Sequence, residues 1–134
     1  MDNKKLSIII VNYKSKKFLF DCIQALEEKI AEVIPHEIIV VNNEGKELTE
    51  TKIKGSTVAP FIYRVIPSYE IHITKPSLEF FKKVLKSIKT KPDECIFIDD
   101  SNKNITSAQE LGIDSILFQN SAQLSEELKK RKII

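Results

Sequence analysis

The stretch that most constrains the fold runs from Cys95 to Gly112. It opens with four apolar residues that are typical of a short buried strand, and two adjacent carboxylates, Asp99 and Asp100, follow directly. Ser101 can then cap a helix, along which apolar residues recur at helical spacing until Gly112 ends it. A strand followed by a helix places the two carboxylates at the carboxyl end of the strand. Ligands bind at such ends in open α/β sheets.

The rest of the chain alternates in the same way between apolar runs and helical patterns. Runs rich in β-branched residues predict strands at 7–11, 37–41, 61–66, 95–98 and 115–118. Helical spacing predicts a helix at about 18–33, a short polar helix at 46–54, helices after Ser77 and Ser101, and a terminal helix that ends in Lys129-Lys-Arg-Lys132. This alternation implies right-handed crossovers and a parallel sheet with helices on both faces. We therefore expect a single three-layer α/β domain over residues 1–134.

Composition excludes several classes of protein. With 42% apolar and 30% charged residues, the chain is typical of a soluble globular protein. A net charge of +2 is too small to indicate nucleic-acid binding or attraction to an anionic membrane, and no apolar run approaches the length of a membrane span. Cys22 and Cys95 lie in apolar patterns, which predicts buried, reduced thiols and a cytoplasmic location.

The adjacent carboxylates allow two interpretations. They can bind Mg²⁺, directly or through water, because hard cations prefer carboxylate oxygen. Alternatively, Asp99 is satisfied by backbone donors and Asp100 caps the helix that follows. The pair by itself favours neither interpretation over the other.

A Lys-Pro dipeptide two dozen residues upstream of the carboxylates favours the first interpretation. With Lys75-Pro76 and Asp99-Asp100 in this order, residues 61–118 resemble the second half of the haloacid dehalogenase-like (HAD) phosphohydrolases. In that family the lysine steadies the phosphate and the nucleophile, and the aspartate pair holds Mg²⁺. The resemblance implies a Rossmann-like fold with a parallel sheet of five strands in the order 3-2-1-4-5. It also implies that Lys75 binds phosphate and that Asp99 and Asp100 bind the metal.

The first half of the chain departs from the family pattern. The family has Asp-x-Asp after the first strand, where the first aspartate attacks phosphorus and the second is the general acid/base. Here Asn12 and Lys14 stand at those positions, and an amide cannot form an aspartyl-phosphate. The family's phosphate-binding Ser or Thr after the second strand is replaced by Asn42-Asn43, whose amides can still donate hydrogen bonds to phosphate.

The same first third also resembles a second family. Residues 6–15 and 37–43 are similar to the opening of family-2 glycosyltransferases, in which these strands surround the nucleotide of a sugar donor. That family's metal-binding Asp-x-Asp is absent here. Both families begin with a β-α-β unit, so this likeness can reflect shared architecture, and a gene that joins the two kinds of half is a further interpretation.

Three functions follow from these resemblances. The first is a HAD-like protein, catalytically impaired by Asn12 and Lys14, that binds a small phosphorylated ligand or a protein partner. In this protein the Lys14 ammonium could take the place of Mg²⁺ beside the aspartates, which would make Mg²⁺ binding weak or absent. The second is an active Mg²⁺-dependent phosphatase, and the third is a nucleotide-sugar-binding fragment. No segment is long enough for a cap domain, so we expect an open site and, by analogy with capless relatives, a homodimer.

Overall fold

The computed structural model of the protein describes residues 6–12, 16–30, 34–42, 59–67 and 77–134. Within these residues the strands are β1 (Leu6–Asn12), β2 (His36–Asn42), β3 (Arg64–Pro67), β4 (Cys95–Asp99) and β5 (Asp114–Leu117). The α-helices are α1 (Lys16–Ile30), α4 (Leu78–Ile88), α5 (Asn102–Glu110) and α6 (Ser121–Lys130). Two short 3₁₀ helices, η2 (Ala59–Phe61) and η3 (Pro92–Glu94), precede β3 and β4.

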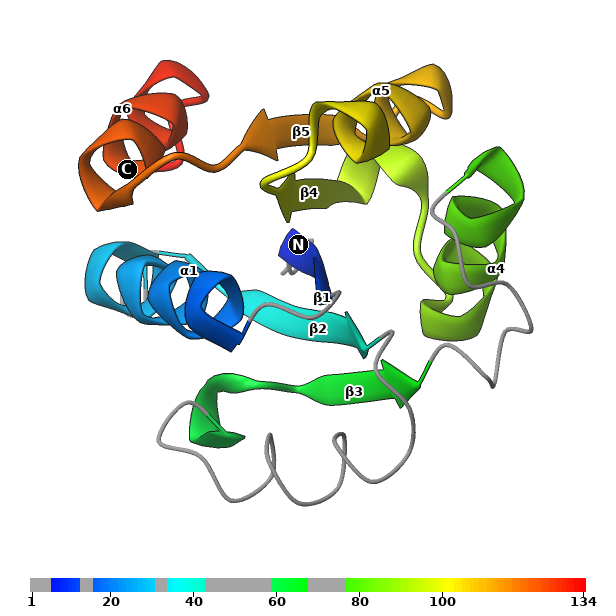
Figure 1. Ribbon diagram of the computed structural model, residues 1–134, viewed down its shortest axis with the longest axis horizontal. Helices are drawn as coiled ribbons and strands as arrows, with labels where there is room; N and C mark the ends of the chain where they lie inside the picture. Colours follow the sequence, from blue (N-terminus) through cyan, green and yellow to red (C-terminus); the bar gives the residue numbers. More distant parts are fainter. Residues whose placement is uncertain (1–5, 13–15, 31–33, 43–58, 68–76) are drawn as a thin grey trace.

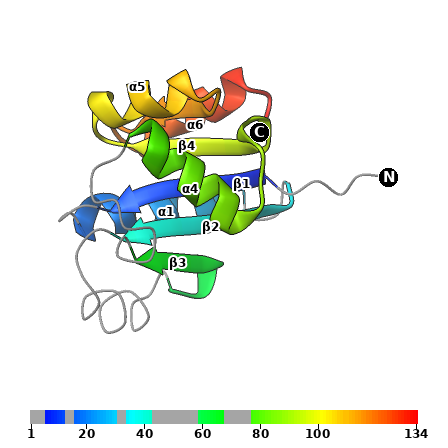
Figure 2. The same cartoon turned by 90° about the vertical axis from the view of Figure 1, so that its right-hand side faces the viewer.

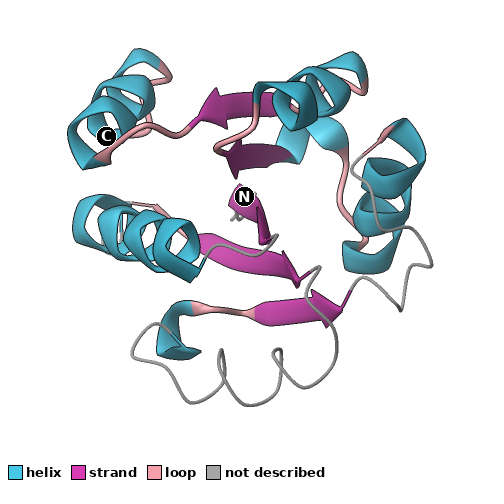
Figure 3. Cartoon of the chain, viewed as in Figure 1, coloured by secondary structure: helices cyan, strands magenta, loops and turns pink. Residues whose placement is uncertain are grey.

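The strands form one parallel sheet in the order β3-β2-β1-β4-β5, as expected from the sequence. α1 and α6 cover one face of this sheet and α4 and α5 cover the other, which gives the predicted three layers (Figure 1). Figure 2 shows the arrows of β1 and β2 pointing the same way, and Figure 3 separates the helical layers from the sheet between them. No helix in the described part of the chain is long and apolar enough to cross a membrane.

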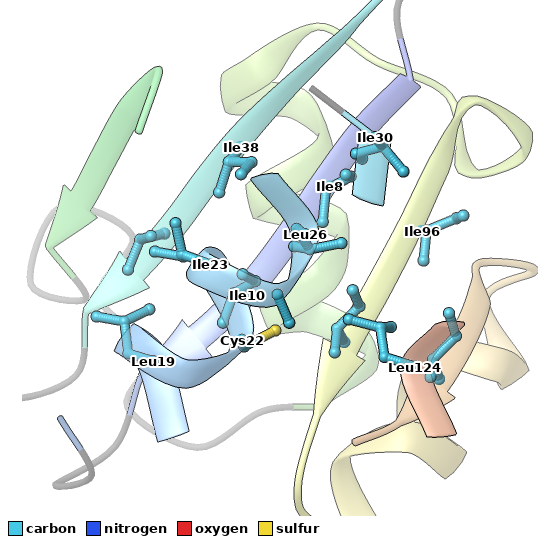
Figure 4. Packing of buried hydrophobic residues seen from close by; sticks show 14 of the residues in the cluster. Ile8, Ile10, Leu19, Cys22, Ile23, Leu26, Ile30, Ile38, Ile96 and Leu124 are labelled. Carbon is cyan, nitrogen blue, oxygen red and sulfur yellow. The ribbon is translucent and has the colours of Figure 1, made fainter. Parts of the chain in front are cut away.

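The central strand β1 is apolar on both faces because helices cover both. Ile8 and Ile10 belong to the core beneath α1 and α6, where Cys22 also lies (Figure 4). Ile9 and Val11 belong to the core beneath α4 and α5. A continuous apolar run is the pattern of a strand buried in this way. Both cysteines are buried free thiols, as predicted.

Helix α4 begins where its sequence predicts. The Ser77 hydroxyl accepts a hydrogen bond from the Phe80 N–H at 3.3 Å and so caps the first turn. Phe80 and Phe81 are fully buried, and the Phe81 ring packs edge-on against Phe97 of β4 with 4.8 Å between ring centroids. This aromatic contact fixes α4 to the centre of the sheet.

The prediction of a third strand at 61–66 is wrong at both ends. Residues 59–61 form η2, and the strand begins only at Arg64. Pro60 has no N–H to donate to a β-ladder, which favours the turn. The strand then continues through Pro67, which the sequence pattern treats as a breaker. Proline is tolerated there because β3 is the edge strand of the sheet.

Other boundaries differ by smaller amounts. α1 begins at Lys16 rather than at 18 and is described to Ile30, so the predicted end at 33 lies outside the described residues. The short helix predicted at 46–54 also lies outside the described residues. The same is true of most of the segment after β2, in which we expected no cap domain. Ser101 occupies the N-cap position of α5, but its side chain makes no capping hydrogen bond.

Arg131 ties the end of α6 to the edge strand β5. Its guanidinium donates to both carboxylate oxygens of Asp114, at 2.8 and 3.0 Å, and to the Glu127 carboxylate at 3.1 Å. We expect Arg131→Ala to lower the free energy of unfolding by about 1–2 kcal/mol in urea titrations, because a partly exposed two-pronged ion pair is lost. Arg131→Lys should lose part of the same free energy, since an ammonium cannot form both hydrogen bonds to the Asp114 carboxylate.

The control for this prediction is Lys129→Ala. The Lys129 side chain is 60% exposed and lies 3.7 Å from Glu126, so its removal should change stability by less than about 0.5 kcal/mol. Equal effects of Arg131→Ala and Lys129→Ala would contradict the prediction.

Candidate active site

The carboxyl ends of the three central strands meet at one edge of the sheet. Asn12 ends β1 and pairs in register with Asn42, which ends β2. On the other side, Ile10 pairs with Ile98 of β4, so Asn12 is level with Asp100 when the register is continued by two residues. Neighbouring strands lie about 4.8 Å apart, which brings the backbones of these predicted site residues together.

Asp99 is a buried carboxyl at the end of β4. Its side chain belongs to a residue that is only 3% exposed, whereas Asp100 is exposed. The Asn104 amide donates to Asp99 Oδ2 at 2.6 Å, from the first turn of α5. The Asp99 carbonyl oxygen accepts from the Phe118 N–H at 2.8 Å, which fixes the backbone at this position to the end of β5.

Burial dominates the acid–base behaviour of Asp99. The pKa of its carboxyl is raised from 3.8 to about 7, chiefly by desolvation, and the neighbouring Asp100 charge contributes to the rise. Hydrogen bonds from the Asn104 amide and the Asp100 backbone lower the pKa but do not offset the burial. Asp99 and Asp100 also share a side-chain hydrogen bond. Two carboxyls that share a proton lack a positive partner among the described residues.

This donor set fits a hard cation. A cation beside Asp99 and Asp100 would replace the shared proton, and carboxylate oxygens are the ligands that Mg²⁺ prefers. Asn104 would orient the Asp99 carboxylate toward such an ion. Among the described residues, however, no three His, Cys, Asp or Glu side chains come together, so the protein side chains there supply two carboxylates rather than a complete coordination sphere.

The alternative structural role of the aspartates is wrong in one respect. The N-cap residue of α5 is Ser101, so Asp100 does not cap that helix. Asp99 does receive a backbone hydrogen bond, from Asp100, in addition to the Asn104 amide. The remaining predicted site residues, Lys14, Asn43 and Lys75, lie outside the described residues, as do the side chains of Asn12 and Asn42.

Two features near the site were not predicted from the sequence. Asn104 follows Asp99 by five residues, and its place in the first turn of a helix after a strand could have identified it as a residue that reaches back to the strand end. The second is that Cys22 of α1, predicted only as a buried thiol, lies near enough to the acidic pair to be affected by its charges. Burial raises the pKa of its thiol well above the usual range, and the Asp99 and Asp100 charges add to this, so Cys22 is an unreactive core residue.

Comparisons with known proteins agree on one family. The family model for haloacid dehalogenase-like hydrolases matches residues 2–118. Drimenol cyclase drtB from Aspergillus calidoustus is 38% identical over 65 residues, which is 48% of this chain and 12% of the cyclase. D-ribitol-5-phosphate phosphatase from Bacteroides thetaiotaomicron is 30% identical over 79 residues, which is 59% of this chain and 38% of the phosphatase. The chain thus spans a minor part of these relatives.

Solved structures show the same fold. A HAD-family enzyme from Bacteroides thetaiotaomicron, in an aspartate-to-alanine variant bound to magnesium and inorganic phosphate, is 29% identical with a TM-score of 0.57, and the match covers 76% of this chain and 52% of that one. The core domain of a putative phosphoglycolate phosphatase from Streptococcus pneumoniae is 18% identical with a TM-score of 0.66, and the match covers 93% and 96% of the two chains. The second likeness concerns the fold alone.

Proposed function

Because the chain belongs to the haloacid dehalogenase-like hydrolase family and has Asn12 at the end of its central strand, we propose that it binds a small phosphorylated ligand without forming an aspartyl-phosphate. The observation that carries the proposal is the position of Asn12, which is level with Asp100 and beside Asn42. A nucleophilic carboxylate is needed at that place to attack phosphorus, and an amide nitrogen or oxygen does not replace it. By family resemblance, Lys75, Asn42 and Asn43 would hold the phosphate.

The counter-charge of the acidic pair is the second part of the proposal. Lys14 follows the last residue of β1 by two positions, and an ammonium beside Asp99 and Asp100 would stabilise both carboxylates. The pair's shared hydrogen bond and the raised pKa of Asp99 support the need for a positive partner. Where Mg²⁺ binds instead, it supplies charge neutralisation of a bound phosphate. The aspartate-to-alanine variant of the Bacteroides enzyme supports the idea that phosphate binding survives the loss of a carboxylate in this family.

The test is to restore the two carboxylates. We expect Mg²⁺ titrated calorimetrically into the wild-type protein to give little or no heat of binding. Asn12→Asp/Lys14→Asp should bind Mg²⁺, because two carboxylates are added to Asp99 and Asp100 and the competing ammonium is gone. The same variant should gain Mg²⁺-dependent hydrolysis of p-nitrophenyl phosphate. Vanadate should bind both proteins.

A single variant separates the effects of the two substitutions on Mg²⁺ binding. Asn12→Asp with Lys14 retained should bind Mg²⁺ more weakly than the double variant. Tight Mg²⁺ binding by the wild-type protein would contradict the proposed counter-charge. Mg²⁺-dependent turnover by the wild-type protein would favour the alternative of an active phosphatase, which the Asp99-Asp100 pair and the family membership support.

The nucleotide-sugar interpretation has no comparable support. The family match includes the first third of the chain, on which the likeness to glycosyltransferases depends. Shared β-α-β architecture accounts for that likeness. A shift of the melting temperature by uridine or guanosine diphosphate, without a similar shift by inorganic phosphate, would restore this interpretation.

A further inference from the structure

A cleft of about 330 Å³ opens between α1 and the turn that joins β5 to α6. Figure 1 shows α1 and α6 side by side on one face of the sheet, with β5 leading into α6. The α1 side of the cleft includes Gln24 and Glu28, and the opposite side includes Phe118, Gln119 and Ser121. The cleft adjoins the candidate site, because the Phe118 N–H is bonded to the Asp99 carbonyl.

The turn that forms one wall is held in place by its own hydrogen bonds. The Gln119 N–H donates to the Gln123 side-chain oxygen at 3.1 Å, and the Asn120 side chain caps α6 by accepting from the Gln123 N–H at 2.8 Å. The Gln123 amide in turn donates to the Leu117 carbonyl at 2.9 Å. The wall is therefore formed before any ligand arrives, which lowers the entropic cost of binding.

Several polar side chains in the cleft make no polar contact with the described residues. Within the described part of the chain, the side chains of Gln24, Glu28, Gln119 and Ser121 form no hydrogen bond or ion pair. Two amides and a hydroxyl can each donate and accept, and the carboxylate accepts. Groups of this kind complement a ligand whose own groups both donate and accept.

The charges of the remaining lining do not favour an anion as the main ligand. The one lysine of the cleft, Lys17, is paired with Asp21 at 2.9 Å, which leaves Glu28 as an unpaired negative charge. The lining also has an apolar part: Ala25 is buried, and the Phe118 ring packs edge-on against Phe18 at 5.7 Å. Such a surface can contact the C–H groups of a small carbon skeleton.

We propose that this cleft binds a small polyhydroxylated ligand of the size of a pentitol or a monosaccharide. Hydroxyl groups match the mixed donors and acceptors of Gln24, Gln119 and Ser121, and the carbon chain matches the apolar part of the lining, Ala25 and Phe118. The volume lies at the lower end of the range of about 300–1,000 Å³ for small-molecule pockets. The proposal does not depend on a phosphate site, since every group it uses lies in the cleft.

The experiment is an NMR titration of the ¹⁵N-labelled protein with ribitol, which carries no phosphate. We expect saturable shifts of the Gln24, Phe118 and Gln119 amide signals, with a Kd on the order of 1–10 mM for a ligand of this size. Gln24→Ala and Gln119→Ala should each raise the Kd about fivefold, because each removes a hydrogen bond to the ligand. Gln109→Ala, an exposed amide on α5, should leave the Kd unchanged.

Two comparison ligands make the outcome decisive. 1,5-Pentanediol has the same carbon chain without the middle hydroxyls, and an equal response to it would overturn the proposal in favour of apolar contact alone. Triglycine offers peptide donors and acceptors, and saturation by triglycine but not by ribitol would assign the cleft to a peptide. Absence of saturable shifts at the highest soluble ribitol concentration would also overturn the proposal. None of these results bears on vanadate binding, so the proposed function is tested separately.

Discussion

Lys14→Met, studied in the presence of a chelator, is expected to make stability strongly dependent on pH between about pH 4 and pH 7. Without a cation beside the acidic pair, burial holds the pKa of Asp99 at about 7, far above the 3.8 of an ordinary aspartate. The folded variant then keeps a proton over a range of pH in which the unfolded chain has released it. Its free energy of unfolding therefore falls as pH rises, by up to about 4 kcal/mol above pH 7.

If Lys14 is the counter-charge proposed above, the wild-type protein should show a flatter profile, because its ammonium would stabilise the ionised Asp99 carboxylate and lower the pKa of that group below about 7. Urea titrations at a series of pH values measure both profiles. Lys14→Met/Asp99→Asn should be flat again, since the buried ionisable group is gone. Mg²⁺ should restore the stability of Lys14→Met at high pH, because a cation then occupies the place of the ammonium.

Lys103→Met is the matched control, since Lys103 is an exposed lysine on α5. It should not alter the pH profile. If the wild-type protein itself loses stability across this range, Lys14 is not the counter-charge of the pair. The proposed function would then depend on Mg²⁺ or another cation to neutralise Asp99 and Asp100.

Phe81→Ala is expected to lower the free energy of unfolding by about 3–5 kcal/mol and the melting temperature by roughly 10–15 °C. The Phe81 ring is fully buried and packs edge-on against both Phe80 and Phe97, at 5.3 and 4.8 Å between centroids. Its removal leaves a cavity between α4 and the centre of the sheet. Calorimetric melting and urea titration both measure the loss.

Phe61→Ala is the matched control for this prediction. The Phe61 side chain belongs to a residue that is 45% exposed, in the turn before β3, so its truncation removes little buried surface. We expect a change of less than about 1 kcal/mol. Similar losses for Phe61→Ala and Phe81→Ala would mean that Phe81 does not anchor α4 in the way described.

The sheet could be predicted from the sequence because a strand that is buried on both faces needs apolar residues at successive positions. β1 and β4 are continuous apolar runs, and a strand covered by helices on both faces needs that pattern. The parallel direction of the strands followed from their alternation with helices, whereas their order followed from the family resemblance. β3 was predicted less accurately, because an edge strand has less burial to impose a pattern and tolerates Pro67.

Two residues of the candidate site could be placed in the fold from the sequence, but their electrostatics could not be predicted. Asp99 and Asp100 could be placed at a strand end from the sequence alone, since the apolar run and the following helix define that end. That one carboxyl is buried and the other exposed depends on the packing of α5 and on the Asn104 amide. The difference in burial therefore cannot be read from the identities of Asp99 and Asp100.

By itself, the sequence determined the layers of this protein and showed an asparagine at position 12, where the family resemblance places an aspartate, because periodic apolar patterns and the identity of one residue are local properties. Only the tertiary structure decided that Asn12 pairs with Asn42 and that β4 lies on the other side of β1, because strand register joins residues far apart in the chain. The tertiary structure alone also shows the cleft beside Phe118, which is lined by α1 and by the turn before α6. Contacts between segments far apart in the chain determine the strand register and the cleft, and such contacts cannot be read from the pattern of residues along the sequence.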